Sequence, residues 1–218
     1  MLAYGKTVIE RVDLNEVAYD TAMADMTRWR AERVAGAVGD RLFLLSHPPV
    51  VTYGPRTDPG DLPADLGVPT VPVDRGGYAT YHGPGQLVGY LILDVRTRGP
   101  VDIVRWLENG LVAAVRALGF PAVRRNTPPG EPSLVGVWTE DGRKLASIGM
   151  RIRQGVTSHG FALNVRPDMS VFDRFTVCGL HDITMVSLAQ LAAERGAPVP
   201  PDAAVRDAVA GALAADPA

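Results

Sequence analysis

Cysteine is almost absent from this chain of 218 residues, which contains a single one, Cys178. One cysteine cannot close a disulfide within the chain, and it cannot build a zinc site from several cysteines. No apolar run approaches the ~18 residues that a membrane-spanning helix needs, and the first residues show no basic segment followed by an apolar run. We therefore expect a cytoplasmic protein with no metal, no secretory signal and no membrane partner.

The chain also has little net charge and almost no lysine. Its formal net charge is −2 at pH 7, so we expect no nucleic acid among its partners. Two of its 22 basic residues are lysines, Lys6 and Lys144, and the rest are arginines. A chain that uses arginine nearly everywhere keeps Lys144 inside a strand-like pattern, which raises the question of what needs an amine there.

The length suits one domain, which we take to span residues 1–218. Apolar runs between glycines and prolines predict strands at 6–13, 41–46, 50–54, 70–95 in broken segments, 134–152 and 160–165. Helical spacing predicts helices at 13–38 (with Asp13 and Glu16 as a capping box), 101–118, 186–195 and 202–214. Strands and helices that do not alternate regularly indicate an α+β fold, with a mixed, largely antiparallel sheet flanked by helices.

The stretch GRKLASIGMRI, residues 142–152, predicts the second strand of a hairpin whose turn is Asp141-Gly142. Its even positions are apolar from Ala146 onward, and Lys144 shares their parity. We therefore expect its side chain to lean toward the apolar face. The amine then either reaches out to water, the commoner fate, or is partly desolvated, which favours a neutral, basic form that arginine cannot adopt.

Cys178 lies in FTVCGL, a segment with no clear period. A lone cysteine is usually a small buried apolar residue, but loops carry reactive groups more often than core strands do. A thiol becomes a nucleophile only when a neighbour stabilises or generates its thiolate. The candidates for that neighbour are Lys144, His82, His159 and His181. His47 ranks last, because the prolines after it indicate a structural turn.

RGGYATYHGPGQ, residues 75–86, contains four glycines inside a strand pattern. Such glycines mark a bulge or a place where a ligand approaches the backbone. Taken alone, the segment is also compatible with a bulged hairpin that carries an ordinary histidine. Its spacing matches neither a Walker A loop nor a dinucleotide-binding fingerprint.

These segments, together with HPPVVTYG and SHGFALNV, resemble in order and spacing the signature segments of the lipoyl(octanoyl) transferases of lipoate biosynthesis. The resemblance runs from about residue 40 to 185. It implies an α+β fold like the catalytic domains of biotin and lipoate-protein ligases. It also implies transfer of an octanoyl group, through a thioester on the enzyme, to a lysine of a lipoyl domain.

Carried over residue by residue, the resemblance implies that Cys178 is the nucleophile and that Lys144 stabilises its thiolate or acts as a base. His82 would position donor or acceptor. No cofactor is implied, because thioester-to-amide transfer runs downhill. The residues implied to line the acyl and pantetheine site are Arg75, Gly76, Gly77, Tyr78, Ala79, Thr80, Tyr81, His82, Ser147, Ile148, Gly149, Gly160, Phe161 and Ala162.

The implied partners are octanoyl-acyl carrier protein as donor, and the lipoyl domains of 2-oxoacid dehydrogenases and the glycine cleavage H protein as acceptors. We expect a monomer. Both kinds of partner belong to acidic families, so a cationic patch is one expectation and ordinary solvated charges are the other. The arginines considered for such a patch are Arg124, Arg125, Arg143, Arg151 and Arg153.

Three alternatives remain at this point. The first alternative is an ATP-dependent lipoate- or biotin-protein ligase of the same fold. The second is an amidotransferase that moves an octanoyl group between lipoyl domains. The third alternative is a non-catalytic carrier-binding module, in which Cys178 is a core residue and Lys144 a surface residue.

Overall fold

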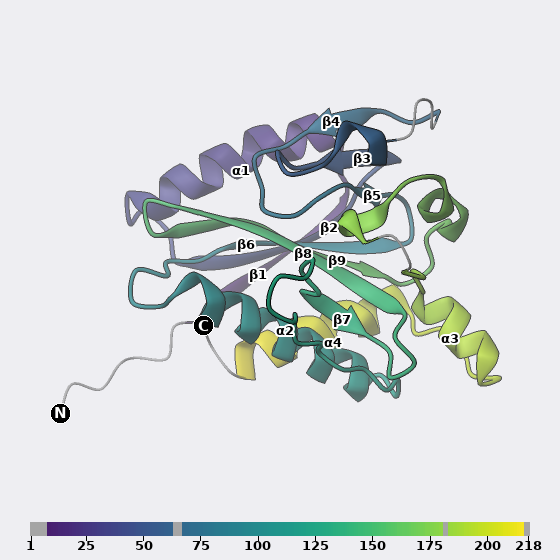
Figure 1. Ribbon diagram of the computed structural model, residues 1–218. Coiled ribbons are helices and arrows are strands. Elements are labelled where there is room, and N and C mark those ends of the chain that lie inside the picture. The colour runs from purple at the N-terminus through teal and green to yellow at the C-terminus, as the bar shows by residue number, and fades with distance from the viewer. Residues whose placement is uncertain (1–7, 63–66, 181–182, 216–218) are drawn as a thin grey trace.

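A six-stranded sheet with helices on both faces organises the molecule (Figure 1). The computed structural model describes residues 8–62, 67–180 and 183–215. In sheet order the strands are β1 (Ile9–Glu16), β2 (Asp40–Ser46), β6 (Gln86–Ile92), β9 (Val156–Asn164), β8 (Lys144–Arg153) and β7 (Gly136–Trp138). A second sheet has the order β4 (Thr70–Pro72), β3 (Val50–Tyr53) and β5 (Thr80–His82).

The helices are α1 (Tyr19–Val34), α2 (Pro100–Ala117), α3 (Leu188–Glu194) and α4 (Asp202–Ala215), with short 3₁₀ turns η1 (Pro59–Asp61), η2 (Met169–Arg174) and η3 (Val177–Gly179). In the large sheet β1 and β2 are parallel and the remaining pairs are antiparallel. The predicted class, α+β with a mixed and largely antiparallel sheet, is therefore confirmed.

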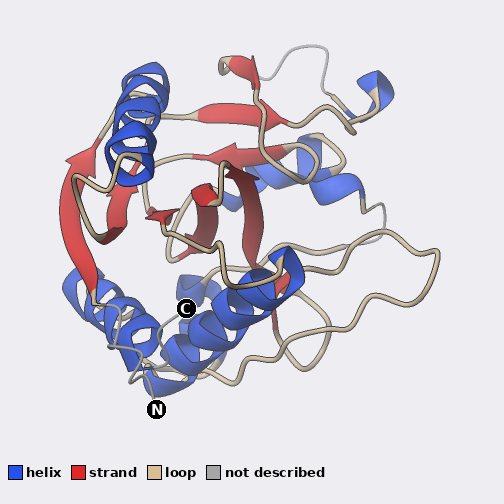
Figure 2. Cartoon of the chain, turned by 90° about the vertical axis from the view of Figure 1, so that its left-hand side faces the viewer, coloured by secondary structure: helices blue, strands red, loops and turns tan. Residues whose placement is uncertain are grey.

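The larger apolar core lies between the sheet and the pair α2 and α4. Helix α2 turns Ile103, Leu107 and Leu111 inward at helical spacing, and all three are fully buried. Alternate residues of the central strands, among them Leu91 and Leu163, meet them from the sheet. Figure 2 shows helices on both sides of the strands, and this core lies on the side of α2 and α4.

The opposite face of the sheet is covered by α1 and by the small sheet β4-β3-β5 (Figure 1). Helix α1 buries Tyr19, Ala22, Met26 and Trp29, and Trp29 stacks on Phe43 with ring centroids 3.7 Å apart. The core here is smaller, because much of this face is taken up by buried polar side chains and cavities.

Both predicted ends of the helix at 13–38 are wrong, since α1 spans Tyr19–Val34. The helix expected from Asp13 begins at Tyr19, and no side chain caps its start. Asp13 instead lies in β1, which pairs with β2, and its carboxylate binds Arg11 and Arg206. Pairing with a distant strand has overridden a local capping signal. The first two residues of the strand predicted at 6–13 lie outside the described residues.

Two tight turns join the strands of the hairpins that carry the site. The predicted turn at Asp141-Gly142 is present and joins β7 to β8. A second turn, at Gln154-Gly155, has positive φ at both residues, as a tight two-residue hairpin requires. The residues of this turn carry no clear signal in the sequence, so the predicted strand begins at residue 160, whereas β9 begins at Val156.

Within the part of the chain that the structure describes, no helix combines the length and the apolar character needed to cross a lipid bilayer.

Candidate active site

A cavity of about 200 Å³ lies beside β8, between the large sheet and the glycine-rich segment 75–78. Cys178 and Lys144 both line it, and so do twelve of the fourteen predicted substrate-binding residues. The described residues that line it include Arg56, Arg75 and Lys144 but no aspartate or glutamate. The cavity therefore has a positive electrostatic character.

Ala79 and Tyr81 are the two predicted residues that do not line the cavity. They alternate in sequence with Thr80 and His82 of β5, which do line it. Tyr81 points the other way and meets Phe172 edge-on, with ring centroids 5.6 Å apart. Ala79 contributes its carbonyl, which accepts the N–H of Cys178 at 2.9 Å.

Cys178 sits in η3 with a left-handed backbone, at φ 59°. Residues other than glycine adopt this conformation rarely, and such strain is commonest at functional sites. The thiol is half-buried, and its Sγ lies 3.5 Å from the hydroxyl oxygen of Ser147. Buried Val177 anchors the turn in a small apolar cluster with Val171 and Phe172. The fold thus holds the thiol against β8.

Lys144 is almost fully buried, with 2% of its surface exposed. The expectation that its side chain leans toward the apolar face is wrong, because the pairing of β7 with β8 shifts by one residue. Val137 pairs with Ala146, but the next residue, Trp138, pairs with Lys144. This bulge at Leu145 turns Lys144 to the cavity side, where its Nζ lies 5.1 Å from the centre of the Trp138 ring.

Gly136 gives Lys144 its space. A Cβ at this glycine would lie 2.8 Å from the Cε of Lys144, closer than real Cβ contacts allow. The N–H of Gly136 donates to the carboxylate of Glu108 on α2 at 2.9 Å. Glu108 is buried, which raises its pKa, while the Gly136 N–H and the cations Arg124 and Lys144 act in the opposite direction. A buried carboxylate therefore lies behind the lysine.

Arg75 supports the glycine-rich segment from inside. One of its terminal nitrogens donates to the carbonyls of Gly76 and Tyr78, both at 3.1 Å. The other donates to the carbonyl and the hydroxyl of Thr52, at 3.1 and 2.8 Å. Burial lowers the pKa of this guanidinium, although it keeps its charge. The predicted binding residue thus shapes the cavity wall by holding backbone carbonyls.

A chain of hydrogen bonds continues from Thr52 through His82. The Nδ1 of His82 lies 2.8 Å from Oε1 of Gln86, and its Nε2 lies 3.3 Å from the Thr52 hydroxyl. The Gln86 amide nitrogen donates to the Tyr81 carbonyl, which orients the amide. His82 therefore carries its proton on Nδ1 and accepts from Thr52 through Nε2.

The same chain reaches the strand that carries Lys144. Gln86 donates to the side-chain oxygen of Asn164 at 2.9 Å, and Asn164 donates to the carbonyl of Val186 at 3.2 Å. The N–H of Val186 then donates to the carbonyl of Lys144 at 2.9 Å. A continuous buried network thus connects the arginine at one wall of the cavity to the lysine at another.

The three histidines that the structure describes, His47, His82 and His159, are neutral near pH 7. Burial, with the nearby positive charges, lowers the pKa of His82 to about 3 and that of His159 to about 4. Burial also lowers the pKa of His47, whose ring nitrogens contact the Val17 carbonyl and the Tyr90 hydroxyl. Of the histidines considered as thiolate partners, His82 is engaged by Thr52 and Gln86, and His181 lies outside the described residues.

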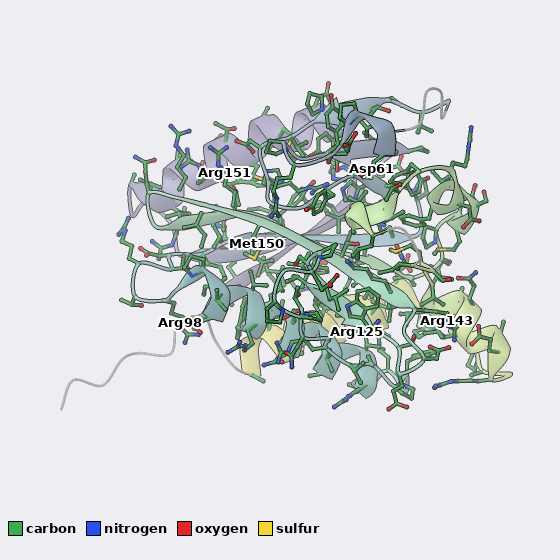
Figure 3. The ribbon with its side chains drawn as sticks, viewed as in Figure 1. Asp61, Arg98, Arg125, Arg143, Met150 and Arg151 are labelled. Atoms are coloured by element: carbon green, nitrogen blue, oxygen red, sulfur yellow. The ribbon has the colours of Figure 1, made fainter. Side chains whose placement is uncertain are left out.

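The arginines considered for a docking patch fall into two separate groups along β8. Arg143 and Arg125 lie near the start of β8, whereas Arg151 lies toward its other end (Figure 3). Arg143 binds Glu194 and Asp141, and Arg151 binds Asp74. These five arginines do not form one continuous patch.

Neither Glu108 nor the hydrogen-bonded chain through His82, Gln86 and Asn164 was predicted from the sequence. Glu108 occupies the apolar stripe of a predicted helix, between Val104 and Leu111, and a charge in such a stripe is a detectable signal. Gln86 and Asn164 lie inside the recognised segments, but their contact joins residues 78 positions apart. Only the folded chain reveals that contact.

The sequence matches the family described as "Lipoyl protein ligase A/B catalytic domain" over residues 18–213. It is 47% identical to an octanoyltransferase of Frankia casuarinae, over 88% of this chain and 89% of that protein. The chain belongs to the octanoyltransferase family. An octanoyltransferase of Geobacter sulfurreducens is 44% identical over 82% of this chain and 74% of that protein.

Solved structures support the same fold. A lipoate-protein ligase A bound with ATP superposes with a TM-score of 0.71 at 16% identity, covering 95% of this chain and 85% of that chain. A biotin protein ligase from Leishmania major in complex with biotin superposes with a TM-score of 0.53 at 12% identity, covering 94% of this chain and 73% of that chain. The expected likeness to these ligase catalytic domains is confirmed.

Proposed function

We propose that this protein transfers an octanoyl group from octanoyl-acyl carrier protein to the acceptor lysine of lipoyl domains, through a thioester on Cys178. Membership of the octanoyltransferase family supports the overall reaction. The observation that carries the covalent route is the half-buried thiol on a strained turn, in the same positively charged cavity as the buried Lys144.

In the first step the thiolate of Cys178 attacks the carbonyl carbon of the donor thioester. The carbon–sulfur bond of the donor breaks, and the released pantetheine thiolate takes a proton from the ammonium of Lys144. Lys144 and Arg75 stabilise the thiolate of the resting enzyme, and the Ser147 hydroxyl donates to it. One thioester replaces another, so this step is nearly balanced in free energy.

In the second step the amine of the acceptor lysine attacks the octanoyl thioester on Cys178. Neutral Lys144 takes a proton from the attacking amine, and the Cys178 thiolate leaves. The product is an amide, which is more stable than a thioester, so the step runs downhill without a nucleotide. Arginine in place of Lys144 would hold its proton too tightly to act as this base.

The N–H groups around the thiol are the donors available for the developing oxyanion. The N–H of Cys178 itself is already donated to Ala79, so it is excluded from this role. We assign the role to the N–H of Gly179, the next residue in the turn, because the N–H groups of Ser147 and Gly149 lie in the pairs that β8 makes with β9.

The test is intact-mass measurement of the protein mixed with octanoyl-acyl carrier protein. We expect a gain of one octanoyl group that Cys178→Ser abolishes and Ser147→Ala retains, because the adduct needs the thiol. The absence of any adduct would favour a carrier-binding module. Octanoylation of a lipoyl domain from octanoate and ATP, without an acyl donor, would indicate a ligase, and a requirement for an octanoylated lipoyl domain as donor would indicate an amidotransferase.

A further inference from the structure

A second cavity, of about 1020 Å³, lies on the same face of the sheet, between α1, the small sheet and the far ends of β8 and β9. We call it the outer cavity and the one at Cys178 the inner cavity. Its lining is largely apolar and includes Met23, Met26, Val50 and Val71. The mechanism above makes no use of this space.

His159 stands between the two cavities, since it lines both of them. Alternation along β9 would send it to the helix side with Phe161 and Leu163, which belong to the α2 and α4 core. Its backbone is left-handed, at φ 59°, and this turns the ring to the other face, where it meets the Tyr90 ring edge-on at 6.2 Å. Such strain in a residue other than glycine is a marker of function.

Contacts on three sides fix this ring. Its Nε2 lies 3.2 Å from a carboxylate oxygen of Asp74, and the other oxygen of Asp74 binds Arg151. The main-chain N–H of His159 donates to the sulfur of Met26 on α1 at 3.2 Å. Strand β8, helix α1 and the loop after β4 all hold the residue in place.

The position of His159 along the sheet matches the length of an octanoyl chain. His159 pairs with Met150, three residues along β8 from Ser147, whose hydroxyl contacts Cys178. Three strand residues advance about 10 Å. An extended octanoyl chain reaches about 9 Å from its carbonyl carbon to its methyl carbon, since a carbon–carbon bond of about 1.5 Å advances about 1.25 Å.

We propose that His159, held by Asp74, is the end wall of the acyl site and sets the upper limit of acyl chain length. The inference rests on the proposed function, and it deepens that function by identifying the residue that selects for chain length. An extended dodecanoyl chain reaches about 14 Å by the same geometry and collides with the ring. Removing the ring joins the inner cavity to the outer one, which then accepts the additional carbons.

The experiment measures the rate of Cys178 acylation by intact mass, with octanoyl, decanoyl and dodecanoyl carrier proteins as donors. In the unsubstituted protein we expect the dodecanoyl rate to fall at least about 100-fold below the octanoyl rate, since even single methylene groups change selectivity 10- to 200-fold. In His159→Gly we expect the ratio of dodecanoyl to octanoyl rates to rise at least about tenfold. Glycine adopts the left-handed backbone without strain.

Two further variants guard against a folding defect. His159→Asn keeps a residue that tolerates positive φ and shortens the side chain. Asp74→Ala removes the partner of the ring at a carboxylate that is 66% exposed, so the fold tolerates the change. We expect both variants to raise the ratio of dodecanoyl to octanoyl rates, and Asp74→Ala to raise it less.

Met23→Ala is the matched control, because Met23 lines the outer cavity alone. The substitution enlarges the outer cavity and leaves His159 in place. We therefore expect the ratio of dodecanoyl to octanoyl rates to stay at its original value. If the unsubstituted protein is acylated by octanoyl donor but all three wall variants keep its ratio, the end wall is disproved and the proposed function stands. If no donor acylates Cys178, the proposed function fails and the wall fails with it.

Discussion

The two faces of the large sheet are built from the same strands and differ in almost every other respect. The face under α2 and α4 is a continuous apolar core, with Leu107 and Leu111 fully buried. The face under α1 holds two cavities, a buried arginine and a chain of polar side chains. The first face stabilises the fold by burying apolar surface. The second face buries polar and charged groups at the reactive site, which costs part of that stability.

Two backbone irregularities decide which residues belong to which face. Alternation alone places both Lys144 and His159 on the apolar side, with Ala146 and Phe161 respectively. The bulge at Leu145 turns Lys144 to the reactive side, and the left-handed backbone turns His159 to it. Both chemically distinctive residues therefore reach the α1 face through local departures from regular strand geometry.

The largest effect is expected at Lys144, where a substitution should lower activity without lowering stability. Lys144→Arg and Lys144→Met should lower octanoyl transfer to a lipoyl domain on the order of 10²- to 10⁴-fold, because neither side chain exchanges a proton near neutral pH. The melting temperature of Lys144→Met, whose side chain is of similar size, should stay near that of the unsubstituted protein. Steady-state transfer assays and thermal unfolding check both points. Full activity in Lys144→Arg would show that the amine need not deprotonate.

The opposite pattern is expected at Leu107 on the helix face. Leu107→Ala should lower the free energy of unfolding by about 2–5 kcal/mol through lost burial and the resulting cavity. The rate of acylation per folded molecule should not change. Val101→Ala on the same helix is the matched control, since Val101 is 66% exposed and the change should stay within about 0.5 kcal/mol. Urea titration and active-site labelling separate the two effects.

A smaller loss of stability is expected at low pH, and it arises from His159 on the α1 face. The folded-state pKa of His159, about 4, lies below the ordinary value of about 6.5. Between these values the unfolded chain binds the proton and the folded protein does not, so stability falls as the pH drops from 6.5 toward 4. The loss at pH 5 is about 2 kcal/mol for this group.

His159→Asn tests this pH dependence. The fall in unfolding free energy between pH 7 and pH 5 should be smaller in the variant by about 2 kcal/mol, because the other titrating groups are common to both proteins. If urea titrations give the same fall in unfolding free energy from pH 7 to pH 5 in both proteins, the assignment of a neutral, buried His159 is contradicted.

The smallest effect is expected at Glu108, the carboxylate that reaches from the helix side toward Lys144. Glu108→Gln keeps an acceptor for the Gly136 N–H and removes the negative charge. The pH profile of octanoyl transfer should shift toward lower pH, because a nearby negative charge that favours a protonated amine has been removed. Glu140→Gln, at an exposed residue in the β7–β8 turn, is the control and should not move the profile. An unchanged profile in Glu108→Gln would limit Glu108 to a structural role.

Much of this arrangement could be predicted from local patterns. The strand–turn–strand around Asp141-Gly142, helix α2 and the mixed sheet all follow from spacing and turn residues. The segments that carry Cys178 and Lys144 were identified by resemblance, and the fold brings them to one cavity. Local patterns failed where a distant partner decides the outcome, as at Asp13, which pairs into a sheet rather than capping a helix.

The direction of individual side chains was harder to predict than the elements that carry them. A bulge changes parity by one residue, and nothing in KLASIG marks the place where it occurs. The contact between Gln86 and Asn164, and that between Glu108 and Gly136, joins residues far apart in the chain. Such contacts depend on packing, so they could not be read from spacing.

The most direct test of the central claim follows the octanoyl group from the enzyme to its acceptor. Octanoylated protein is isolated away from carrier protein and mixed with a lipoyl domain in the absence of ATP. We predict that the octanoyl group leaves Cys178 and appears on the acceptor lysine, at a rate no slower than the overall turnover. An octanoyl-enzyme that persists while the complete mixture still turns over would contradict it, since the thioester on Cys178 would then be a side product.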